Sequence, residues 1–72
     1  MMDRQPVKTF DGRIIGWIDT DTVTGDQTGR DFYQRIVGYY DKKYNVTRDF
    51  YKRIKYRGNM LAALIQEESH IK

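Results

Sequence analysis

Cationic and flat aromatic side chains interleave along this chain, and that combination suits the capture of an anionic ligand. Rings such as Trp17 and Tyr39 could stack on bases, which is worth about 1–3 kcal/mol per base, while arginines bond phosphate oxygens. Tyr33 and Tyr51 are further candidates for stacking. The residues expected to bind the ligand are Arg13, Trp17, Arg30, Arg35, Tyr39, Arg48, Arg53, Lys55 and Arg57. Their pattern predicts a site for a nucleotide or a nucleic acid.

The same side chains also have an ordinary structural use. Each guanidinium could stack on a neighbouring ring, or pair with Asp31 or Asp49 across the strands. The sequence leaves the binding role and the structural role both open.

Positive charge is concentrated in the middle of the chain, although the formal net charge is only +3. Residues 1–29 carry three basic and five acidic side chains, residues 30–57 carry nine and three, and residues 58–72 carry one and two. The middle segment favours an anionic partner. The alternative is a solvated Lys and Arg surface that binds nothing.

Residues for catalysis, metal binding or phosphate cradling are sparse. The single His70 has the only Ser, Ser69, as its neighbour and there is no Cys, so a nucleophile with its base is not predicted and His70 is expected to be solvated. Asp19, Asp21 and Asp26 lack the Gly and distal Glu of a calcium loop and are expected to form turns. Thr24 to Gly29 lacks the Lys of a P-loop. We therefore expect no enzyme, no metal and no cofactor.

One short segment occurs three times and indicates the elements that carry these residues. Phe10, Phe32 and Phe50 are each followed three residues later by Arg and four residues later by Ile, and the last two are preceded by Arg-Asp. Such self-similarity is typical of a repeated supersecondary unit. The chain is expected to be one domain over residues 1–72, mainly β (α+β), an antiparallel meander of three β-hairpins over 7–57 with one C-terminal helix.

Turn residues and alternation set the expected hairpins. The expected strands are 7–10, 13–19, 30–32, 35–41, 44–50 and 53–56, with a long loop from Thr20 to Gly29. Met1 to Pro6 is expected to fray, although Pro6 would suit a strand start or a sheet edge.

Alternation along the return strands divides them into two faces. Ile14, Gly16, Ile18, Ile36, Gly38, Tyr40, Ile54 and Tyr56 are expected to face the core. A two-residue turn would pair Phe10 with Arg13, whereas a three-residue loop with a bulge would pair Phe10 with Ile14. We favour the longer loop, with the three Phe in the core. The repeated Gly16 and Gly38 would permit a bend, or a ring lying across the backbone.

Helical spacing appears only near the C-terminus. Asn59 can cap a helix over residues 59–69, whose apolar stripe includes Leu61, Leu64, Ile65 and Ile71. That stripe needs a partner, either the sheet or the helix of a second subunit. It motivates an alternative function, a protein-interaction or structural module with its interface at Leu61, Leu64 and Ile65.

Size and hydropathy complete the expectations. A domain of 72 residues without cysteine has a marginal core, so aromatic packing and homo-oligomerisation are expected to stabilise it. No apolar run approaches the ~20 residues that span a bilayer, and residues 1–7 do not resemble a signal peptide. We expect a soluble cytoplasmic protein with no membrane partner.

The run Phe10-Asp11-Gly12-Arg13-Ile14-Ile15-Gly16-Trp17 and its copies resemble the small bacterial and phage-associated proteins described as four-fold β-flowers. The resemblance covers Val7 to Arg57, with three copies instead of four and a degenerate third copy. It implies hairpins that radiate as petals around a pseudo-symmetry axis. It implies no activity.

Overall fold

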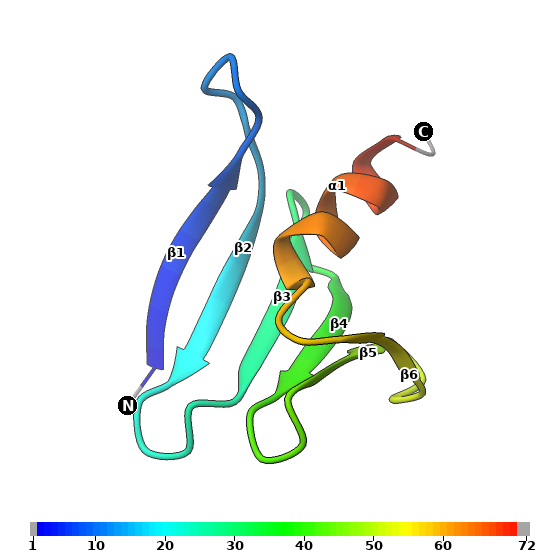
Figure 1. Ribbon diagram of the computed structural model, residues 1–72. Helices are drawn as coiled ribbons and strands as arrows, with labels where there is room; N and C mark the ends of the chain where they lie inside the picture. Colours follow the sequence, from blue (N-terminus) through cyan, green and yellow to red (C-terminus); the bar gives the residue numbers. More distant parts are fainter. Residues whose placement is uncertain (1, 71–72) are drawn as a thin grey trace.

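The computed structural model describes residues 2–70, and side chains from residue 2 to residue 68. It is a six-stranded antiparallel sheet in the order β1-β2-β3-β4-β5-β6, with one helix lying across it (Figure 1). The strands are β1 (Met2–Lys8), β2 (Ile14–Asp21), β3 (Gln27–Asp31), β4 (Ile36–Asp41), β5 (Val46–Asp49) and β6 (Ile54–Arg57), and the helix is α1 (Leu61–His70). The predicted fold class, mainly β with a C-terminal helix, is confirmed.

Two boundaries differ from the sequence-based expectation. Strand β1 begins at Met2, so the fraying predicted for residues 1–6 is wrong over residues 2–6, where each residue is paired with β2. Pro6 lies opposite Trp17 on this edge strand, where its missing N–H can face solvent. Strand β3 already begins at Gln27, so the loop expected over 20–29 is shorter.

The hairpin turns after β1, β3 and β5 are built alike. Each is a three-residue loop closed by a bond from the preceding amide to the following arginine carbonyl, as from Asp31 N to Arg35 O at 2.9 Å. The third loop residue has a positive φ, 89° at Gly12, 72° at Gln34 and 67° at Lys52. The favoured loop length of three residues is therefore correct, but the favoured pairing of Phe10 with Ile14 is wrong, because Ile14 lies opposite Lys8.

The position of the three Phe in these loops corrects a prediction. Each Phe is the first loop residue rather than the last strand residue, because the turn begins one position earlier than expected. Phe10 is fully exposed, and Phe32 and Phe50 are 56% and 54% exposed. Their predicted burial in the core is wrong.

A β-bulge follows each of these turns and decides which side chains are buried. The strand register skips Ile15, Val37 and Lys55, so alternation shifts by one position there. Ile15 is buried with Val7 and Ile65, and Val37 packs against that cluster. The core therefore uses Ile15 and Val37 in place of the predicted Ile14 and Ile36, while Ile54 is largely exposed.

Helix α1 packs on β2, β3 and β4 where the sheet has no side chains. A Cβ at Gly16 would lie 2.4 Å from the Arg30 carbonyl oxygen and 2.6 Å from Ile65 Cγ2. Leu61 and Leu64 lie in the same way over Gly29 and Gly38. The glycines thus accept aliphatic helix side chains, and not the aromatic ring that the sequence suggested.

The start of α1 is fixed by two side chains. Asn59 Oδ1 accepts a hydrogen bond from the Leu61 amide at 3.3 Å, as the predicted cap requires. The buried Thr47 hydroxyl accepts one from the Met60 amide at 2.8 Å and donates to the Gly58 carbonyl at 2.7 Å. The helix is confirmed, its partner is this chain's own sheet, and Ile71 lies outside the described residues.

Candidate anion-binding groove

A groove of about 900 Å³ lies between the β3–β4 turn and the β5–β6 turn. Its lining includes the side chains Arg30, Arg35, Phe50, Tyr51, Arg53 and Lys55, with Leu64 of the helix at its base and Asp31, Asp49 and Glu68 among the acidic residues. Four of the predicted ligand-binding residues are therefore brought together here, namely Arg30, Arg35, Arg53 and Lys55.

The two turns that border the groove are held by aspartates. Asp31 Oδ1 accepts hydrogen bonds from the Tyr33 and Arg35 amides, each at 2.9 Å, and Oδ2 accepts one from Arg35 Nε at 2.9 Å. Asp49 Oδ1 does the same for the Tyr51 and Arg53 amides at 2.9 and 3.0 Å. Asp-Phe-Tyr-x-Arg is thus a turn motif in which the carboxylate replaces backbone partners.

These contacts keep both carboxylates ionised. Burial acts to raise the pKa of Asp31, but hydrogen bonds from Arg35 and Tyr33 outweigh it and hold the pKa below its ordinary value. The hydrogen bond from the Arg53 amide is the main cause that lowers the pKa of Asp49.

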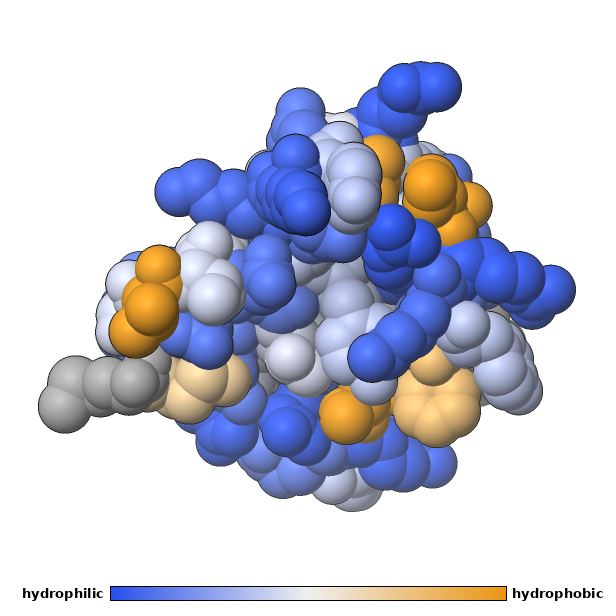
Figure 2. All heavy atoms as spheres, turned by 90° about the horizontal axis from the view of Figure 1, so that it is seen from below, coloured by the Kyte–Doolittle hydropathy of each residue, from blue (hydrophilic) through white to orange (hydrophobic). Residues whose placement is uncertain are grey.

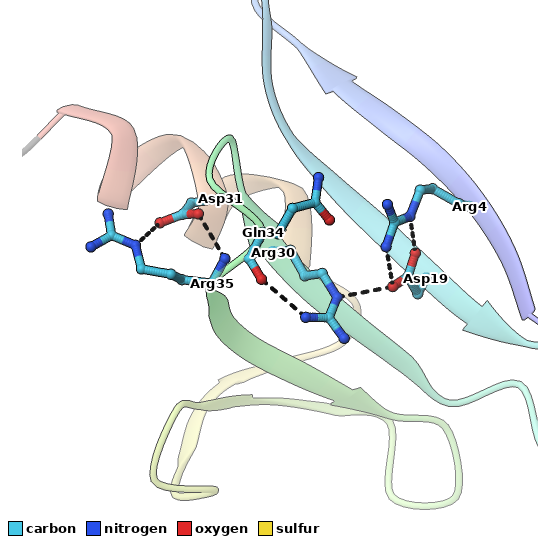
Figure 3. Close-up of polar contacts among 6 residues, drawn as sticks. All are labelled: Arg4, Asp19, Arg30, Asp31, Gln34 and Arg35. Atoms are coloured by element: carbon cyan, nitrogen blue, oxygen red, sulfur yellow. Dashed lines mark hydrogen bonds and ion pairs between the residues drawn. The ribbon is translucent and has the colours of Figure 1, made fainter.

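Each aspartate also orients an exposed arginine. The side chains of Arg35 and Arg53 are 68% and 77% exposed, and they lie over Tyr33 and Tyr51 at 5.5 and 5.4 Å from the ring centres. Of the Arg35 guanidinium, only Nε contacts Asp31, and the terminal nitrogens point away from that carboxylate (Figure 3). A guanidinium held by one nitrogen keeps its other donors for a ligand.

Arg30 serves the fold more than the groove. It donates from Nε to Asp19 Oδ2 at 3.0 Å and from Nη1 to the Gln34 carbonyl at 3.0 Å (Figure 3). Arg4 reaches the same carboxylate from β1, at 2.6 and 3.0 Å. Asp19, only 6% exposed, therefore joins β1, β2 and β3, and the hydrogen bonds from Arg4 are the main cause that lowers its pKa.

Arg48 repeats the role of Arg30 one hairpin later. It donates to the Lys52 carbonyl at 3.0 Å and to Asp41 Oδ2 at 3.4 Å. Lys55, which lines the groove, lies 3.8 Å from Glu67 of the helix. The ring stacking and Asp pairing weighed as the structural role of the arginines are thus both present.

The remaining predicted ligand residues lie elsewhere. Trp17 and Tyr39 pair across the strands with Arg30 and Arg48, and each ring is covered by a cation, Arg4 at 5.8 Å and Lys52 at 4.9 Å. Trp17 Nε1 is buried without a hydrogen-bond acceptor among the described residues. Arg13 and Arg57 are exposed outside the groove. The groove thus collects about half of the predicted set.

The sequence reading missed the binding potential of Phe50, which it placed in the core. The signal was available, because Asp49 and Arg53 are four residues apart around the Phe-Tyr pair, and Asp before a turn commonly bonds the turn amides. An Asp that bonds the turn amides would have placed Phe50 in the loop.

The other sequence candidates have structural explanations. Asp21 Oδ1 accepts from the Val23 amide at 2.9 Å and forms a turn as predicted, whereas Asp26 Oδ1 accepts from the Lys42 amide of the next loop at 3.0 Å and Asp19 is a strand residue. Within the described part of the chain, no group of His, Cys, Asp and Glu could hold a metal ion. The side chains of Ser69 and His70 lie outside the described set, so the solvation of His70 stays a prediction.

The predicted interface residues are not on the surface. Leu61, Leu64 and Ile65 are on the buried face of α1, which packs against this chain's own sheet. Across residues 2–70, no helix is long and apolar enough to cross a membrane.

The comparisons with known proteins add no relative. No protein-family model, curated protein or solved structure matches this chain. The β-flower resemblance therefore stays a prediction.

Proposed function

We propose that this chain is a non-enzymatic binding module that captures or sequesters an anionic ligand, a nucleotide or a nucleic acid, in the groove between the β3–β4 and β5–β6 turns. The observation that carries the proposal is the pair of exposed arginines, Arg35 and Arg53, each held by one nitrogen at the margin of that groove. Lys55 adds a third cation to the same lining.

Charge balance and preorganisation both support an anion. Asp31 and Asp49 turn their oxygens to the turn amides, so those carboxylates are occupied while the outer guanidinium nitrogens face solvent. An arginine already held in one orientation loses less side-chain entropy when a phosphate binds. The same aspartates that neutralise the arginines therefore also prepare them for a ligand.

The alternative, a protein-interaction module acting through α1, gains no support. Its apolar residues are covered by the sheet, and on the face seen in Figure 2 the hydrophobic side chains of the described residues lie in separate patches among hydrophilic ones. The homo-oligomeric state and the cytoplasmic location stay predictions, which native mass spectrometry and cell fractionation would check.

Isothermal titration of the chain with ATP, and separately with tripolyphosphate, tests the proposal. We expect binding that weakens steeply between about 50 and about 200 mM salt, and a loss of about tenfold in affinity for Arg35→Ala or Arg53→Ala, because each removes a phosphate contact.

Arg13→Ala is the matched control, because Arg13 holds the equivalent turn position of the first hairpin outside the groove. It should bind as the parent does, and circular dichroism should show that all three variants fold. Absence of binding to nucleotides, oligonucleotides and polyphosphate at low salt would refute the proposal.

A further inference from the structure

Two hairpin tips carry the same arrangement of rings and cation. Phe32 and Tyr33 meet edge to face at 5.5 Å and 88°, and Phe50 and Tyr51 do so at 5.3 Å and 84°. All four rings are exposed. With Arg35 over Tyr33 and Arg53 over Tyr51, each tip presents one unit of two rings and one guanidinium.

The two units meet the same groove to different extents. Phe50, Tyr51 and Arg53 all line it from the β5–β6 turn, whereas the β3–β4 turn contributes Gln34 and Arg35, with Phe32 and Tyr33 outside the lining. Within the described chain these four rings lie outside the buried core and are accessible to a ligand. Two like units at one groove fit a ligand that itself repeats.

We infer that the ligand of this groove is single-stranded nucleic acid, with successive nucleotides bound one per tip. The inference rests on the proposed function and names its ligand class. At each tip a base stacks on the rings or on the guanidinium plane, and the adjoining phosphate bonds the terminal nitrogens of Arg35 or Arg53. A duplex hides its base faces, and a mononucleotide occupies one tip only.

The first hairpin provides an internal control. Phe10 is exposed at the same turn position, but Asp11 replaces the tyrosine and this tip does not line the groove. A ring that attracts nucleic acid only because it is exposed would act at Phe10 as well as at Tyr33 and Tyr51. A difference between Phe10 and these tyrosines isolates the groove.

Fluorescence anisotropy with labelled oligothymidylate of about eight nucleotides tests the inference, with competition by thymidine monophosphate, a duplex of equal length and polyphosphate. We expect the unlabelled oligothymidylate to displace the labelled one better than any of these competitors. Tyr51→Leu and Tyr33→Leu should each weaken binding about tenfold, as expected for one lost stacking contact, and the double variant about a hundredfold, whereas Phe10→Leu should have no effect.

The outcomes separate this inference from the proposed function. If the monophosphate competes as well as the oligonucleotide, or the tyrosine variants bind normally, the inference is overturned and the anion-binding function stands. Equal competition by polyphosphate has the same meaning, because charge alone then decides. If no probe binds the parent chain at low salt, both are overturned.

Discussion

At the scale of single residues, three equivalent turn positions adopt the left-handed backbone region with different side chains. Gly12 does so without strain, whereas Gln34 and Lys52 bear a Cβ there. Gly12→Ala should lower the free energy of unfolding by about 1 kcal/mol. Gln34→Gly should leave it unchanged or raise it slightly, because relief of strain offsets the entropy of glycine. Urea unfolding of both variants checks this, and a loss of stability in Gln34→Gly would contradict it.

Asp19 provides a second residue-scale prediction. Its buried carboxylate accepts charge-assisted hydrogen bonds from Arg4 and Arg30. Asp19→Asn should lower the free energy of unfolding by about 2 kcal/mol, because the amide has one accepting oxygen in place of two and leaves the two cations unbalanced. Asp3→Asn, at an exposed position of β1, is the control and should change little. Equal midpoints for the two variants in urea would show that the ion cluster adds no stability.

At the scale of elements, the contact between α1 and the sheet depends on missing side chains. A methyl group at Gly16 would meet a backbone carbonyl, whereas one at Gly29 would meet only side chains of the helix, Leu61 at 2.9 Å and Ile65 at 3.3 Å. Gly16→Ala should therefore cost about 3 kcal/mol and Gly29→Ala about 1 kcal/mol, since a side chain can shift and a strand backbone cannot. Thermal unfolding followed by circular dichroism measures which variant is less stable. A larger loss of stability in Gly29→Ala than in Gly16→Ala would refute this account of the packing.

The hairpins and the helix followed from local sequence, but the residue that is buried directly after each turn did not. Asp11-Gly12 and Asn59 are local signals with a direct backbone cause, and the corresponding turn and helix start are present. A bulge was expected with the three-residue loop, but its position at Ile15 and Val37 has no such signal, because the neighbouring Ile14 and Ile36 are also apolar and either could be buried. The bulge therefore displaced only Ile14 and Ile36 from the predicted core face, whereas Gly16, Ile18 and Gly38 beyond it face the core as predicted.

The candidate site was predictable only in part for a related reason. Charge counting identified Arg30 and Arg35 alike, although Arg30 is tied to Asp19 and Gln34 while Arg35 keeps free donors. Whether the guanidinium of an arginine is already bound within the fold depends on which carboxylate lies opposite it across the sheet. That depends on register, which composition does not reveal.

At the scale of the whole molecule, several carboxylates have lowered pKa values, which gives stability a definite pH dependence. Hydrogen bonds from Arg4, from the Val23 amide and from the Arg53 amide are the main causes at Asp19, Asp21 and Asp49 respectively. A folded pKa below the unfolded value of about 3.9 adds stability above that value and loses it as pH falls through the folded pKa. The melting temperature should thus decrease as the pH is lowered below about 4. The decrease should be smaller in Asp19→Asn than in the parent chain. An equal fall in both would contradict the role of Asp19.

The place of α1 along the chain has a consequence for the timing of folding. Every strand pairs with its neighbour in sequence, so the sheet can assemble hairpin by hairpin while the chain is being synthesised. The hollow over Gly16, Gly29 and Gly38 nevertheless stays uncovered until Leu61 to Ile65 emerge from the ribosome. A nascent chain stalled after Arg57 would therefore hold paired strands around an unfilled core, the state in which it is most open to proteases and chaperones.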